Sequence, residues 1–174
     1  MAGTVDPLGK ITSGDDLLGK IRNALSGFIG YFDRENRREA DKLLRTTVAD
    51  RYQQQWERIS AIQRQMIETG QLEDVDQLEA AAIKLRGFID RVQTASYGYA
   101  GFFDAVRINS NELQKLYSYD LQLLEDVNSI SSAIDNIEAS MGSEGLPAAI
   151  RHLTTLSQEV VDAWDRRDEV LLAV

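Results

Sequence analysis

The 174-residue chain has no cysteine, one histidine and two prolines. Without cysteine it can form no disulfide, thiolate metal site or thiol nucleophile. The single His152 rules out histidine-rich metal motifs, and Ala149 stands where a helical di-iron site would need a glutamate. We therefore expect a surface histidine, no metal or other cofactor, and no enzymatic activity.

Long apolar runs are also missing. No stretch approaches the roughly 18 apolar residues that cross a bilayer, and the first ten residues do not follow a signal-peptide pattern. Residues 1–13 contain Gly3, Pro7, Gly9 and Ser13 without periodicity. We expect a flexible leader over 1–13, a single domain over 14–174 and a cytoplasmic protein.

Excess positive charge is absent, since the formal net charge is -9. Residues 1–51 hold 9 basic and 8 acidic groups, whereas 52–174 hold 10 basic and 20 acidic groups. Non-specific nucleic-acid binding depends on cationic surface. The chain as a whole is not expected to bind nucleic acid.

Apolar residues instead recur every three or four positions along most of the chain, which is typical of amphipathic helices. Helices are expected over 15–26, 33–69, 73–96, 102–141 and 146–174. Gly70 and the glycines at 142 and 145 separate the long ones, and no strand signal occurs. This pattern predicts an all-α, elongated antiparallel helical bundle.

Two seven-residue stretches, 27–33 and 98–104, match at four positions and exchange one aromatic residue for another at two more. They are 71 residues apart, and each precedes a long helical run. The match predicts an internal duplication, with two tandem αα-hairpins over about 27–97 and 98–174 after a short amphipathic N-terminal helix. The alternative is that any two amphipathic helices align at some offset.

These two stretches form what we call the Gly-aromatic turns. Their glycines and rings are Gly27, Gly30, Tyr31, Phe32, Gly98, Gly101, Phe102 and Phe103. Flexible backbone beside a helix N-terminus can hold an anionic ligand. The favoured interpretation is structural, with the glycines allowing sharp turns and the rings plugging the end of the bundle.

A candidate interaction surface combines an apolar helix face with a basic stripe. Its members are Leu17, Leu18, Ile21, Leu25, Arg34, Arg38, Lys42 and Arg45. Apolar and cationic groups together suit contact with an anionic membrane. Glu35, Glu39 and Asp41 alternate with the cations, however, which is more typical of a solvated helix face.

Three polar residues, Asn109, Asp120 and Arg167, fall on otherwise apolar seams. We expect Asn109 to be buried opposite Ile89 as a register-specifying amide. If the second hairpin turns near residues 142–143, facing residues sum to about 287, which sets Asp120 against Arg167. The pair would fix hairpin register; the alternative is that both side chains reach solvent.

These features favour a non-enzymatic scaffold or protein–protein interaction module, with a protein partner and possible homo-oligomerisation. The alternative is a peripheral membrane protein that uses the candidate interaction surface. A third class, an enzyme or ligand carrier, would need a deep pocket lined by the Gly-aromatic turns.

Overall fold

The computed structural model describes residues 7–95 and 99–173, and within these ranges all regular structure is helical. Its helices are α1 (Pro7–Ala24), α2 (Arg37–Glu68), α3 (Leu72–Thr94), α4 (Ala100–Asp104), α5 (Ser110–Ser140) and α6 (Leu146–Leu172). The all-α prediction is confirmed. None of the helices in the described ranges is long and apolar enough to cross a membrane.

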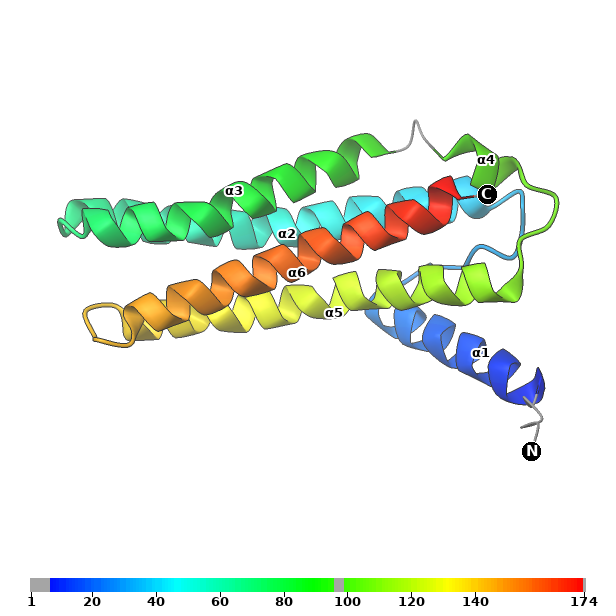
Figure 1. Ribbon diagram of the computed structural model, residues 1–174, viewed down its shortest axis with the longest axis horizontal. Helices are drawn as coiled ribbons and strands as arrows, with labels where there is room; N and C mark the ends of the chain where they lie inside the picture. Colours follow the sequence, from blue (N-terminus) through cyan, green and yellow to red (C-terminus); the bar gives the residue numbers. More distant parts are fainter. Residues whose placement is uncertain (1–6, 96–98, 174) are drawn as a thin grey trace.

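The four long helices lie side by side along the longest axis of the molecule (Figure 1). Helix α2 packs against α3 and α5, and α6 packs against the same two helices. We call α2, α3, α5 and α6 the body. The connections at 69–71 and 141–145 lie at one end of it, the turn end, while 25–36 and 105–109 lie at the other, the loop end.

Glycines with left-handed backbone end two helices at the turn end. Gly70 has φ +78° and Gly142 has φ +76°, a region that side chains with a Cβ rarely adopt. The amide of Gln71 donates to the carbonyl of Met66 at 2.8 Å, and that of Gly70 donates to Ile67 at 3.1 Å. This is the Schellman pattern that stops a helix and pairs its last carbonyls.

The apolar seams of the body meet in a continuous core. Tyr52, Phe88 and Trp164 form successive edge-to-face contacts with ring centroids 4.9 and 6.0 Å apart. The Tyr52 hydroxyl donates to the Leu123 carbonyl at 2.8 Å, so this buried polar atom is paired. The period of three and four therefore locates the core of the long helices correctly.

Helix α1 packs on α5 and slants away from the body towards its N-terminus (Figure 1). It begins at Pro7, well before the expected Asp15. Leu18, Ile21 and Leu25 are each at most 5 % exposed. Helices in proteins owe most of their stability to the packing of an apolar face, and α1 docks its apolar face on the body.

The expected single helix over 102–141 is wrong, because the chain breaks into α4 and α5. Val106, which would lie on the buried face of a continuous helix with apolar residues every three or four positions, is 77 % exposed. Asn109 is exposed rather than buried opposite Ile89, and its Oδ1 accepts the amide hydrogen of Glu112 at 2.8 Å. Asparagine is a strong N-cap, and the local hydrogen bond starts a new helix there.

We expect Asn109→Ala to lower the free energy of unfolding by about 1 kcal/mol, the usual cost of losing an N-cap. Asn109→Asp keeps the acceptor and should be close to wild type. Urea unfolding followed by circular dichroism measures both. A gain in stability for Asn109→Leu would restore the buried-amide interpretation and contradict this one.

The two Gly-aromatic turns do not share a backbone path. Gly30 has φ +92° in an irregular segment, whereas Gly101 lies inside α4. Gly27 follows α1 with φ +84°, while Gly98 lies outside the described residues. The two turns therefore differ in backbone where they can be compared, which does not support the predicted internal duplication.

Candidate functional site

Five polar side chains meet in the core near the loop end, and we call them the ion cluster. Its members are Tyr31 from the loop, Asp41 and Arg45 from α2, Asp120 from α5 and Arg167 from α6. Tyr31, Asp120 and Arg167 are fully buried and Asp41 is 1 % exposed. The side chain of Arg45 is 11 % exposed and covers the cluster on one side.

Arg167 is at the centre of the ion cluster. Its Nε donates to Asp120 Oδ1 at 2.6 Å, and its Nη2 donates to Asp41 Oδ1 at 2.7 Å. The second oxygen of Asp120 accepts from the Tyr31 hydroxyl at 2.7 Å, and the second oxygen of Asp41 accepts from Arg45 Nε at 2.7 Å. All four carboxylate oxygens are thus paired, which ties α2, α5, α6 and the loop together.

The ion pair expected from the arithmetic of the second hairpin is therefore present between Asp120 and Arg167. The role of that pair in fixing register stays a prediction. Asp41 was not predicted as a member, although the sequence held a signal for it. Continuing the Leu44 and Val48 seam backwards by the same spacing reaches Asp41 and then Arg37, both of which are buried.

Burial dominates the electrostatics of the ion cluster. Desolvation raises the pKa of Asp120, and the charge and hydrogen bond of Arg167 offset only part of that rise. Desolvation alone would lower the pKa of Arg167, but Asp120, Tyr31 and Asp41 outweigh it, so the pKa is raised. The two guanidinium groups balance the two carboxylates, so the interior holds no excess charge.

The first Gly-aromatic turn forms the wall of the ion cluster. The Tyr31 ring stacks on Tyr117 with centroids 5.4 Å apart, and the edges of Phe28 and Phe102 meet it. The Tyr31 amide donates to the Tyr117 hydroxyl at 2.8 Å. Tyr31, Phe102 and Phe103 are buried as expected of a plug, whereas Phe32 is 59 % exposed.

Gly30→Ala should destabilise the protein by about 2 kcal/mol or more, since it combines a left-handed backbone with a steric clash. A Cβ there would lie 2.7 Å from the Tyr117 hydroxyl and 3.3 Å from Leu18 Cδ1. Gly27→Ala is the matched control, because its φ is +84° but its nearest neighbour, Leu43 Cδ2, is 3.9 Å away. Equal losses in thermal unfolding for the two variants would show that the contact with Tyr117 is unimportant.

Arg37 joins the two segments of the loop end, and sequence reasoning missed it. Its Nε donates to the Tyr31 carbonyl at 2.9 Å and its Nη1 to the Ala105 carbonyl at 2.6 Å. It is 4 % exposed. Desolvation, followed by repulsion from Arg34, lowers the pKa of Arg37. This residue fixes the segment 25–36 against 105–109.

The apolar half of the candidate interaction surface is covered by the body. Leu18, Ile21 and Leu25 are buried against the body, and Leu17 is half-buried. Within the basic stripe, Arg38 pairs with Asp104 at 3.1 Å and stacks over the Phe103 ring, while Arg45 belongs to the ion cluster. Arg34 and Lys42 remain exposed.

A hollow of about 400 Å³ lies over the ion cluster. It is lined by Arg38, Asp41, Lys42, Arg45, Thr46, Gln93 and Phe103. Phe103 is the member that comes from a Gly-aromatic turn, so the hollow touches these turns at its edge. The two cations that flank Lys42 are already paired with carboxylates, whereas Lys42 makes no ion pair with any residue that the structure describes.

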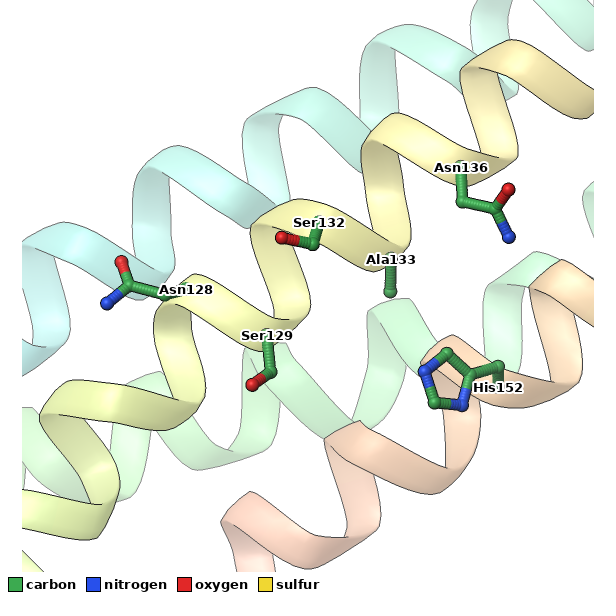
Figure 2. A pocket seen from close by; sticks show the side chains of 6 residues that line it. All are labelled: Asn128, Ser129, Ser132, Ala133, Asn136 and His152. Carbon is green, nitrogen blue, oxygen red and sulfur yellow. The ribbon is translucent and has the colours of Figure 1, made fainter.

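A second hollow, of about 460 Å³, runs between α5 and α6 (Figure 2). Its lining holds no carboxylate, ammonium or guanidinium group: it consists of Asn128, Ser129, Ser132, Ala133 and Asn136 on α5, and the exposed His152 on α6. A nucleophilic pair needs a hydrogen bond between hydroxyl and base, and His152 makes none within the described residues. In the same ranges, no three carboxylate or imidazole groups converge to hold a metal ion.

Comparison with models of known protein families, with curated protein sequences and with solved structures finds no match to this chain. Its function is inferred from its own geometry.

Proposed function

We propose that this chain is a non-enzymatic scaffold in the cytoplasm that presents the outer surface of a stiff helical body to another protein. The observation that supports it is the ion cluster, in which Asp41, Asp120 and Arg167 are at most 1 % exposed and the two guanidinium groups neutralise the two carboxylates. Groups paired in this way position helices and are not free to act on a substrate.

The scaffold is proposed to be an elongated antiparallel bundle of two tandem hairpins. Support comes from the side-by-side contacts of α2 with α3 and of α5 with α6, together with the contacts between the two pairs. An internal duplication remains the explanation offered for the similar Gly-aromatic turns, although their different backbones do not support it.

The surface proposed for the partner lies between α3 and α6. Ile83 is 62 % exposed on α3, with the small residues Ala80 and Gly87 exposed on either side of it. A hollow of about 490 Å³ beside them is lined by Gln77, Ala80, Ile150, Arg151, Thr154 and Thr155. A large apolar side chain surrounded by small ones can serve as the anchor of a helix-in-groove contact.

Affinity capture from the native host, followed by mass spectrometry, tests this proposal. Wild-type chain, Ile83→Asp and Val106→Asp are used as baits; Ile83 and Val106 are both exposed but lie on different surfaces. We expect a stoichiometric partner that Ile83→Asp loses and Val106→Asp retains. Identical captures for all three baits would overturn the assignment of this surface.

Contact with an anionic membrane is the alternative function. Its support is weaker than the sequence suggested, because the apolar face of α1 is buried and two cations of the stripe are paired. Co-sedimentation with phosphatidylserine vesicles, abolished by high salt and by Lys42→Glu with Arg34→Glu, would favour it over the scaffold.

A further inference from the structure

The second half of α1 is bonded to the loop that follows it, and we call residues 15–31 the clasp. Arg22 Nε donates to the Phe28 carbonyl at 3.2 Å, so the helix is tied to its own loop. A Cβ at Gly30 would lie 3.3 Å from Leu18 Cδ1, which places the side chain of Leu18 against the same loop. The helix and the loop are therefore held together as one unit.

The clasp reaches from the surface of α5 into the ion cluster. The amide of Tyr31 donates to the Tyr117 hydroxyl at 2.8 Å, and the edge of the Phe28 ring meets the Tyr117 ring with centroids 6.4 Å apart. The hydroxyl of Tyr31 donates to Asp120 Oδ2 at 2.7 Å. Tyr31 is the member of the ion cluster that the clasp supplies, while the other four come from the body. Docking of the clasp therefore completes the ion cluster.

The clasp is held less firmly than the helices of the body. Each helix of the body packs on at least two others, whereas α1 packs chiefly on α5. Gly19 lies inside α1, and nothing is within 4 Å of a Cβ at this position, so no close neighbour requires a residue that weakens a helix. Few packing partners and a weak helix are features of segments that open locally while the rest stays folded.

Two guanidinium groups of α2 fasten the clasp. Arg51 Nη2 donates to the Ala24 carbonyl at 2.7 Å, and Arg37 Nε donates to the Tyr31 carbonyl at 2.9 Å. Water can bind the same donors and carbonyls once they separate, so the net gain from each bond is modest. These bonds therefore position the clasp without preventing it from opening.

We propose that the clasp opens reversibly as one unit while the body stays folded, and that each opening withdraws Tyr31 from Asp120. The clasp is then a conformational switch that links α1 to the ion cluster. Because such coupling is reciprocal, holding α1 away from α5 loosens the ion cluster, and weakening the bond of Tyr31 releases α1. Opening of the clasp does not depend on the scaffold function proposed above.

Hydrogen exchange of individual amides in the full chain, measured by NMR, tests the proposal. Helices in proteins owe most of their stability to packing, so α1 loses its helix when it leaves α5, and its amides exchange. The amide of Leu25, bonded to the Ile21 carbonyl at 2.7 Å, is one of the probes over 21–25. Relative to their intrinsic rates, these amides should exchange at least about tenfold faster than those over 48–62 in α2, because local opening needs less free energy than global unfolding.

Tyr31→Phe and Tyr52→Phe form a matched pair, because each loses one buried hydroxyl that donates a hydrogen bond. In Tyr31→Phe the closed clasp loses its bond to Asp120, which the open clasp does not make. Exchange over 21–25 should therefore accelerate by about tenfold or more, the usual effect of a hydrogen bond to a charged group. Tyr52 bonds within the body, which stays folded when the clasp opens, so Tyr52→Phe should leave these amides within about twofold of wild type.

Gly19→Ala tests the weakness of the helix. Alanine stabilises a helix relative to glycine, so this variant should slow exchange over 21–25 by about fivefold. The substitution adds a methyl group in open space, so it does not disturb the packing of the closed clasp.

Four results would overturn the proposal. If the amides over 21–25 are as protected as those over 48–62, the clasp opens only when the whole protein unfolds. Equal acceleration of these amides by Tyr52→Phe and Tyr31→Phe leads to the same conclusion. If Tyr31→Phe accelerates the body amides but not those over 21–25, α1 opens with Tyr31 still bound in the ion cluster. Unchanged exchange in Gly19→Ala would show that α1 does not unfold on opening.

Discussion

Arg167→Met is expected to lower the free energy of unfolding by about 3–5 kcal/mol, the usual result of removing one partner from a buried ion pair. The variant would leave Asp120 and Asp41, both at most 1 % exposed, without the guanidinium that binds them. Asp41 keeps Arg45, but Asp120 keeps only the hydroxyl of Tyr31. Urea unfolding at neutral pH measures the loss.

The matched control is Arg167→Met combined with Asp120→Leu. Replacing both charges with apolar groups removes the uncompensated carboxylate, so the double variant should be more stable than Arg167→Met alone. Neighbouring groups of this kind couple by about 0.5–3 kcal/mol in a double-mutant cycle. A coupling energy near zero would show that the two side chains do not stabilise each other. It would contradict the prediction that the pair fixes the register of α5 and α6.

The pH dependence of Arg167→Met gives a second measurement. Burial already raises the pKa of Asp120, and removing the offsetting cation raises it further. The native state of the variant then binds a proton more readily than the unfolded state, so its stability rises as the pH falls. The difference in free energy of unfolding between the variant and wild type should therefore become smaller as the pH falls from neutral to about pH 5.

Alkali should unfold the protein cooperatively between about pH 10 and 12, because four buried tyrosines ionise more readily when unfolded. Desolvation raises the pKa of Tyr117 to about 12, with the charge of Asp120 adding to the rise. It also raises the pKa values of Tyr31, Tyr52 and Tyr99, each of which is at most 2 % exposed. The hydroxyl of Tyr99 is further held by Asp168.

The direction of this pH dependence follows from the number of protons that the folded and unfolded states bind. The pKa of each of these tyrosines is higher in the folded state than the unfolded value of about 10, so the unfolded state loses its protons first. Below about pH 10 these tyrosines do not lower the free energy of unfolding. Above that pH, each of them lowers it by about 1.4 kcal/mol for every further pH unit. Four such residues remove most of a typical stability of about 5–15 kcal/mol within two pH units.

Phenolate absorbance at 295 nm and far-ultraviolet circular dichroism, recorded on one titration, test this prediction. The two transitions should coincide if ionisation requires unfolding. In Tyr52→Phe, unfolding should release one proton fewer, so the alkaline transition should be less steep. This variant also loses the hydrogen bond to the Leu123 carbonyl. Phenolate signal from these residues near pH 10 with unchanged helix content would contradict the prediction.

The sequence determined the helices α2, α3 and α6 and the Asp120–Arg167 contact. Apolar spacing identifies a helix when one face is buried along its whole length, as in α2, α3 and α6. The pair could be found from numbers alone because a short turn at Gly142 fixes how two adjacent helices face each other. Constraints of this kind depend on residues that are close together in the chain, so they can be predicted from the sequence.

The conformation and the contacts of the loop end became clear only from the tertiary structure. The apolar run through Val106 looked continuous, yet the Asn109 cap and the Arg37 bond to Ala105 end the helix there. Likewise, Gly30 and Gly101 share a motif but differ in backbone, since Gly30 has φ +92° in an irregular segment beside Tyr117 and Gly101 lies inside α4. Asp41 and Tyr31 join Arg167 across separations of 126 and 136 residues. Contacts between elements so far apart depend on how helices pack in three dimensions, which spacing along one helix does not encode.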